Sequence, residues 1–64
     1  MKVEYDVTTD SMYISLKEGV SAESEEVTDG VVLDFDDAGK VVGIDIQHAS
    51  QRADIDKLSF ERVA

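Results

Sequence analysis

The sequence contains no cysteine and only one histidine among its 64 residues. A disulfide bond, a thiolate metal site or a Cys/His zinc cluster therefore cannot form, although small domains commonly rely on such staples. A chain of this length makes one domain, and folding buries only about 60% of the surface that the unfolded chain exposes. We therefore expect a marginal core that is supplemented by oligomerisation or by a partner.

Long hydrophobic runs are also absent. No apolar stretch approaches the roughly 20 residues that are needed to span a bilayer. The amino-terminal residues 1–4 lead directly into an alternating pattern, without the apolar region of a signal peptide. We therefore expect a cytoplasmic protein that has no membrane partner.

Basic residues are few. Six lysines and arginines stand against 15 aspartates and glutamates, which gives a formal net charge of -9. Such a charge repels nucleic-acid phosphates and anionic membrane surfaces, and it favours basic protein partners. Direct binding to nucleic acid is therefore not expected. A second interpretation, that the charge only keeps a small protein in solution, stays open.

Apolar residues recur mainly at every second position, which is typical of half-buried strands. The clearest pair of strands covers residues 31–36 and 41–46, and the short loop between them contains Gly39, which suits a tight hairpin. Residues 3–16 indicate another hairpin. The glutamate-rich stretch 22–27 is typical of a solvent-facing edge strand, because charge there blocks edge-to-edge pairing.

The pattern changes after His48. Ser50 can cap a helix, so we expect one or two helical turns over residues 50–57 and a short extended piece through Val63. The predicted fold class is mainly β or α+β: a small antiparallel β-meander sheet with a short C-terminal helical segment. Residues 1–64 form a single domain, with the meander core at 1–48 and the C-terminal segment at 49–64.

A single sheet with one apolar and one acidic face must cover the apolar face with something. Two parts of the system are candidates for covering the apolar face: the C-terminal segment of the same chain, or a second copy of the chain. The C-terminal segment could cover the face alone with Ile55, Leu58, Phe60 and Val63. Alternatively, a second copy of the sheet could pack against it. We predict a homodimer, because small cores without staples commonly rely on association.

Four passages carry a resemblance to a known family. They are Val3-Glu4-Tyr5-Asp6, Asp10-Ser11-Met12-Tyr13-Ile14-Ser15-Leu16, Gly30-Val31-Val32-Leu33-Asp34-Phe35-Asp36 and Gly39-Lys40-Val41-Val42-Gly43-Ile44-Asp45-Ile46. In order and spacing, over roughly residues 1–50, the chain resembles the Domain of Unknown Function 2283 family. The resemblance implies a small prokaryotic protein with a compact β-rich fold, and it transfers no catalytic residues. Some members resemble the antitoxin half of toxin–antitoxin pairs, which implies a basic partner as a hypothesis.

The spacing Asp34-x-Asp36-x-Ala38-Gly39, with Asp45 further on, resembles an EF-hand calcium loop. Ala38 replaces one ligand, an aspartate replaces the final bidentate glutamate, and both flanks have strand periodicity. We therefore predict solvated carboxylates, with no metal and no cofactor. Clustered acids could also serve as an acid/base pair, but a small sheet offers little volume for a pocket. An enzyme, metal-dependent or carboxylate-based, is the alternative to our prediction of a non-enzyme.

Two sets of residues are candidates for contact with a partner protein. Tyr13 alternates away from the apolar face and combines a large ring with a polar tip, and Val32 and Val41 would form a modest apolar patch beside it. The dense charge run can steer a basic partner or can simply be a solvated face; it consists of Glu23, Glu25 and Glu26. The predicted function is a protein–protein interaction module, and a purely structural homo-oligomer is a further alternative.

Overall fold

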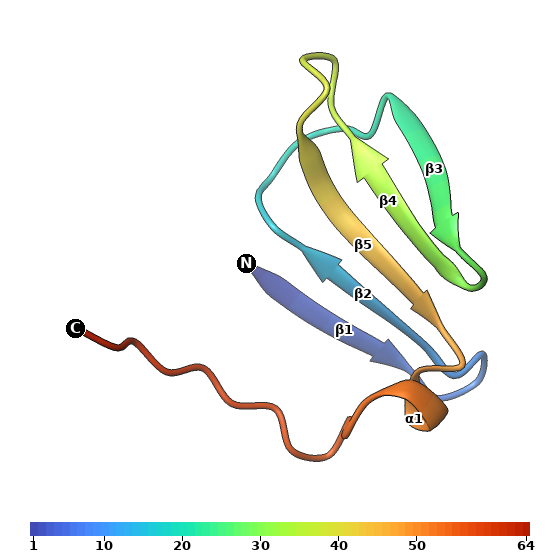
Figure 1. Ribbon diagram of the computed structural model, residues 1–64, viewed down its shortest axis with the longest axis vertical. Coiled ribbons are helices and arrows are strands. Elements are labelled where there is room, and N and C mark those ends of the chain that lie inside the picture. Colours follow the sequence, from blue (N-terminus) through green and yellow to red (C-terminus); the bar gives the residue numbers. More distant parts are fainter.

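The computed structural model describes residues 1–64 and contains one five-stranded antiparallel sheet (Figure 1). The strands are β1 (Lys2–Asp6), β2 (Ser11–Ser15), β3 (Glu23–Thr28), β4 (Val31–Phe35) and β5 (Val41–Gln47). One short helix, α1 (Ala49–Arg52), follows the last strand. The predicted fold class, a mainly β antiparallel sheet with a short C-terminal helical segment, is confirmed.

The strand order is β1-β2-β5-β4-β3, so it differs from that of a sequential meander. The segment 16–22 carries the chain from β2 across the ends of β5 and β4 to the far edge of the sheet (Figure 1). It is tied there because Leu16 donates its N–H to the Val42 carbonyl and Ala22 donates its N–H to the Phe35 carbonyl. The apolar strand β5 thereby takes the centre, and the glutamate-rich β3 takes the edge position predicted for it.

The two predicted hairpins, β1–β2 and β4–β5, are both present. An aspartate carboxylate closes each turn by accepting hydrogen bonds from two backbone N–H groups: Asp6 in the first turn and Asp36 in the second. Short polar side chains favour turns through this kind of bond. Gly39 has φ 79° in the second turn, as its place in the predicted loop requires.

The helix is shorter than the sequence predicts. Four residues are helical, and the N-cap position belongs to His48, an exposed residue with left-handed φ of 54° and no capping hydrogen bond from its side chain. Ser50 lies inside the helix, so its predicted role as the N-cap is wrong. The chain is already extended at Ala53, with φ -142° and ψ 155°. No helix of this structure has the length and apolar character needed to cross a membrane.

Little of the molecule is buried. Only three hydrophobic side chains form the core, those of Met12, Val42 and Ala49. The sheet is a single layer, and residues 53–64 run beside the edge formed by β1 instead of across a face (Figure 1). A two-layer arrangement is the usual way to bury a sheet face, and a single chain does not complete one here.

Candidate interaction surfaces

The polar face of the sheet contains a hydrogen-bond network centred on Asp34. The Tyr13 hydroxyl donates to one oxygen of the Asp34 carboxylate at 2.6 Å. The Ser24 hydroxyl donates to the other oxygen, also at 2.6 Å. These residues lie on β2, β4 and β3, so the network links three strands across the intervening β5.

Gly43 makes this network possible. It lies in β5 between Ser15 of β2 and Asp34 of β4, directly beneath the Tyr13 side chain. A Cβ atom built on Gly43 would overlap the hydroxyl oxygen of Tyr13. A glycine inside a strand often marks such a close approach, because only a residue without a side chain leaves the space.

The network moves the pKa values of Tyr13 and Asp34 further from neutral pH. The hydrogen bond to Asp34, followed by desolvation, raises the pKa of Tyr13 to about 12. Hydrogen bonds from Ser24 and then from Tyr13 lower the pKa of Asp34 below its usual value. At neutral pH the phenol is therefore a proton donor and the carboxylate an ionised acceptor.

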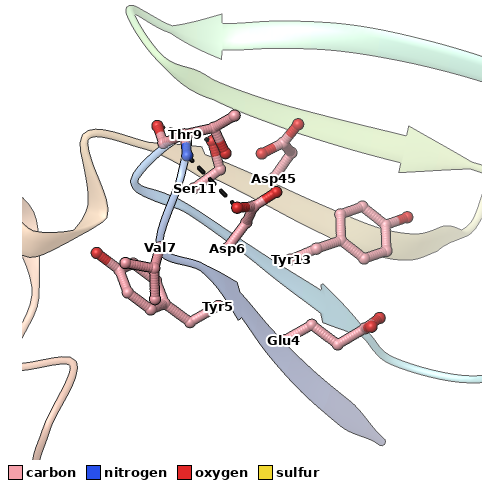
Figure 2. A pocket seen from close by; sticks show the side chains of 8 residues that line it. All are labelled: Glu4, Tyr5, Asp6, Val7, Thr9, Ser11, Tyr13 and Asp45. Carbon is pink, nitrogen blue, oxygen red and sulfur yellow. Dashed lines mark hydrogen bonds between the residues drawn. The ribbon is translucent and has the colours of Figure 1, made fainter.

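A hollow beside the network has an acidic lining (Figure 2). The carboxylates of Glu4, Asp6 and Asp45 line it together with Tyr13, and Figure 2 shows Asp6 and Asp45 close to the β1–β2 turn. No lysine or arginine is among the eight lining residues. This part of the polar face therefore attracts cations and repels anions.

The opposite face is apolar and open. Cross-strand partners share a face, and the pairing of the four strands β1, β2, β5 and β4 brings ten residues together there. Only two of them are buried, and even Ile44 and Ile46 of the central strand are only half-buried. We call this set the apolar face: Val3, Tyr5, Met12, Ile14, Val31, Leu33, Phe35, Val42, Ile44 and Ile46.

The C-terminal tail, residues 53–64, borders the apolar face without covering it. Ile55 and Leu58 line a hollow together with Val3 and Met12 at the β1 side of the face. Nevertheless Leu58 is 71% exposed and Phe60 is 76% exposed. The sequence allows the C-terminal segment to cover the apolar face alone. The structure shows that the tail does not do so.

The three aspartates of the EF-hand-like spacing do not converge. Asp34 is engaged by Tyr13 and Ser24, and Asp36 closes its turn and forms an ion pair with Lys17 at 3.6 Å. Asp45 lines the acidic hollow instead. The chain has no group of three or more histidine, aspartate or glutamate side chains placed to hold a metal ion.

The three predicted contact residues Tyr13, Val32 and Val41 lie in different environments in the sheet. The Tyr13 hydroxyl is already committed to Asp34. Val32 pairs with Asp45 and therefore lies on the polar face, half-buried. Val41 has the parity of Gly43 and Asp45 along β5, but it lies at the register shift near the end of β4, opposite Phe35. Val32 is thus on the face of Tyr13, and the contact patch with Val41 stays a prediction.

The three glutamates of the charge run are all exposed on β3, and they divide between the two faces. Glu23 and Glu25 pair with Phe35 and Leu33, so they lie on the same side of the sheet as the apolar face, at its edge. Glu26 instead accepts a hydrogen bond from the Gly30 N–H at 3.2 Å. The apolar face therefore ends in carboxylates along β3.

Sequence reasoning missed two features. The first is the network of Ser24, Asp34 and Tyr13, for which the available signal is Gly43 in the middle of an otherwise strong strand. The second is Asp10, which accepts hydrogen bonds from the Tyr5 hydroxyl at 2.6 Å and from the Ser50 hydroxyl at 2.7 Å. No local pattern indicates that second contact, because it joins residues forty positions apart.

The fold and these surfaces define a small, mainly β protein with one acidic face and one open apolar face. The family described as protein of unknown function (DUF2283) matches residues 2–50, and the chain belongs to this family. An uncharacterized protein of Methanocaldococcus jannaschii is 37% identical over 57 residues, which cover 89% of this chain and 48% of the relative. The chain therefore spans about half the length of this curated relative. No solved structure matches the chain.

Proposed function

We propose that this chain is a protein-interaction module whose contact surface is the apolar face of its sheet. The observation that carries the proposal is the exposed area. A folded chain of 7.0 kDa is expected to expose about 4,000 Å². This chain exposes 5109 Å², an excess of about 1,100 Å² over that expectation. The excess belongs to the sheet and the extended tail together, because Leu58, Phe60 and Val63 of the tail are among the exposed large hydrophobic residues. A standard protein interface buries about 800 Å² on each partner, so the excess is of the size of one interface.

The position of this surface supports the same function. Monomeric proteins rarely expose a contiguous apolar patch larger than a few hundred Å². Here ten apolar-face residues from four adjacent strands are contiguous, and eight of them, including the central Ile44 and Ile46, are only half-buried. A partner that covers these side chains would supply the second layer that the sheet lacks.

The enzyme alternative receives less support from the geometry. It needs Asp34, Asp36 and Asp45 to act together on a substrate. Two of these carboxylates already accept hydrogen bonds from other groups of the chain, and the third faces a separate hollow. Their surroundings suit a structural role better than acid/base chemistry.

The antitoxin-like function is a second candidate, and the acidic hollow favours it. Glu4, Asp6 and Asp45 line this hollow with no cation among them. Such a surface accelerates association with a basic protein, and its effect weakens as salt is added. Under this second hypothesis the polar face binds the toxin, and the apolar face still binds the partner described above.

Photo-crosslinking in the native host tests both candidates. A photoreactive phenylalanine analogue would replace Phe35 on the apolar face, Val7 at the acidic hollow, or Val20 as a control that is 86% exposed and outside both surfaces. We expect a discrete protein adduct from position 35 and none from position 20. Equal labelling at positions 35 and 20 would refute the apolar-face proposal. A basic protein attached at position 7 would support the antitoxin-like function.

A further inference from the structure

We propose that the protein covering the apolar face is a second copy of this chain, with the C-terminal tail of each copy lying against β3 of the other. This inference rests on the proposed function, and it names the partner. The two sheets would pack face to face, about 10 Å apart, as in a β-sandwich. Such an interface is isologous, because the same surface is used twice.

The arrangement of polar and apolar residues on this face suits self-association. The ten apolar residues occupy the middle of the face, and charged residues are confined to its margins. Interfaces between identical chains typically have an apolar centre and a polar rim. No carboxylate would be buried at the centre, because Asp34 and Asp45 lie on the other face.

The tail is placed to reach a second molecule. Residues 58–64 make no hydrogen bond to the rest of the chain, and Leu58, Phe60 and Val63 are between 71% and 85% exposed. Figure 1 shows the tail running beyond the edge of the sheet formed by β1. Leu58 and Phe60 line a hollow together with Val3 and Ile14 of their own sheet, yet they remain mostly exposed, so further burial of their apolar surface has to come from another molecule.

Charge decides how the two copies are oriented. The tail carries Lys57 and Arg62, while the two ion pairs within the chain, Lys2–Glu4 and Lys17–Asp36, involve neither of them. Glu23 and Glu25 fringe the apolar face at β3, the edge opposite to the tail. Within one chain the whole width of the sheet separates the two groups. They can meet only between copies.

Only one of the two simple twofold arrangements brings these charges together. If the axis runs parallel to the strands, β1 and the tail of one copy face β3 of the other, and Lys57 meets Glu25. If the axis lies across the strands in the plane of the sheet, β3 faces β3, and the glutamates of the two copies repel each other. Like charges placed together at an interface are costly, so the parallel axis is favoured.

The first experiment measures the mass of the purified chain by light scattering during size-exclusion chromatography at about 100 μM and at tenfold dilutions. We expect twice the mass of 7.0 kDa at the highest concentration. Replacing Leu58→Ser and Phe60→Ser together should raise the dissociation constant at least about tenfold, because apolar anchors dominate interface energies. The matched control Val20→Ser removes an exposed apolar side chain outside the interface and should leave the constant unchanged.

A monomer at the highest concentration would overturn the inference of a second copy. It would leave the proposed function standing if position 35 is crosslinked to a different protein in the host. The absence of any adduct at position 35 would instead remove the proposed function. A dimer that is unaffected by the Leu58→Ser and Phe60→Ser changes would overturn the role of the tail.

A charge exchange tests the orientation. Glu25→Lys and Lys57→Glu should each raise the dissociation constant about threefold to tenfold at low salt, as expected for charge pairs at a rim. The double variant should return to the native value, because both pairs re-form with their signs reversed. Glu18→Lys is the control for the change in net charge, and circular dichroism verifies that each variant folds. Two weakened single variants without recovery in the double variant would overturn the tail-to-β3 contact.

Discussion

The hydroxyl of Tyr13 and the carboxylate of Asp34 are 2.6 Å apart although their strands, β2 and β4, do not pair with each other. The tyrosine ring reaches over the central strand β5, where Gly43 leaves it room. The polar face therefore contributes to holding the sheet together. This contribution matters in a chain that buries only three hydrophobic side chains.

The Tyr13→Phe substitution tests the energetic contribution of this contact. The ring stays in place, while Asp34 loses one donor and keeps Ser24. We expect the free energy of unfolding to fall by about 1–2 kcal/mol, as for a hydrogen bond to a charged acceptor. Urea denaturation at one fixed protein concentration measures this. Ser21→Ala, which removes a 3.3 Å hydrogen bond to the nearby Glu23 carbonyl, is the control. Equal stability of Tyr13→Phe and the native chain would contradict the assigned role.

The Gly43→Ala substitution tests the space beneath the ring. The added methyl group would overlap the Tyr13 hydroxyl, so the ring must shift and the bond to Asp34 must weaken. We expect a loss of about 1–3 kcal/mol in the free energy of unfolding, which is typical of overpacking. In a Tyr13→Ala background the same substitution should cost less than about 0.5 kcal/mol, because the obstacle is gone. A similar cost in both backgrounds would show that the methyl group acts through another contact.

The Tyr13 phenol should resist ionisation. Its pKa of about 12 in the folded chain lies above the unfolded value of about 10. The stabilisation that it provides is therefore fully present below about pH 10 and is lost as the pH rises through about 12. In a Tyr5→Phe chain, Tyr13 is the one remaining tyrosine, so phenolate absorbance reports it alone. The midpoint should lie near 12 while circular dichroism shows a folded sheet, and Asp34→Asn should lower it. A midpoint near 10 in the folded Tyr5→Phe chain would contradict the hydrogen bond.

Much of the sheet could be predicted from local pattern. The alternation of residues 31–36 and 41–46 determines two strands and their shared hairpin, since the turn between them is short and contains Gly39. The glutamates of residues 22–27 likewise favour an edge. These features could be predicted because strand alternation and tight turns are determined by residues that are close together in the sequence.

The strand order and the course of the C-terminal segment could not be predicted in this way. The segment 16–22 is long enough either to turn back beside β2 or to cross to the far edge, and the hydrogen bonds of Leu16 and Ala22 to β5 and β4 decide between them. Ser50 has the residue type of a helix cap, yet its hydroxyl bonds to Asp10. A contact across forty positions overrides the local preference, because tertiary hydrogen bonds compete with caps for the same side chain.

Asp10 is expected to anchor the helix and the start of the tail to the sheet. Its carboxylate accepts bonds from Tyr5 and from both the N–H and the hydroxyl of Ser50, and these bonds lower its pKa. The stabilisation is therefore present above the unfolded pKa of about 4 and is lost as the pH falls below it. Asp10→Ala should increase the rate of amide hydrogen exchange at Ala49 and Ser50 about tenfold or more at neutral pH, while β4 and β5 keep their protection.

The control for this experiment is Asp10→Asn. Asparagine tolerates the left-handed φ of 54° at this position and retains one acceptor oxygen, so its exchange rates should fall between those of the native chain and Asp10→Ala. The extra protection of Ala49 and Ser50 in the native chain, relative to Asp10→Ala, should decrease as the pH falls below about 4 and the Asp10 carboxylate becomes protonated, after correction for intrinsic exchange. If the native chain keeps its extra protection of these amides at a pH where carboxyl NMR chemical shifts show Asp10 to be protonated, the ionised carboxylate does not hold the helix. The anchor would then be the packing of Ala49, which is fully buried, together with the hydrogen bond that the Ala49 N–H donates to the Asp10 carbonyl at 2.9 Å.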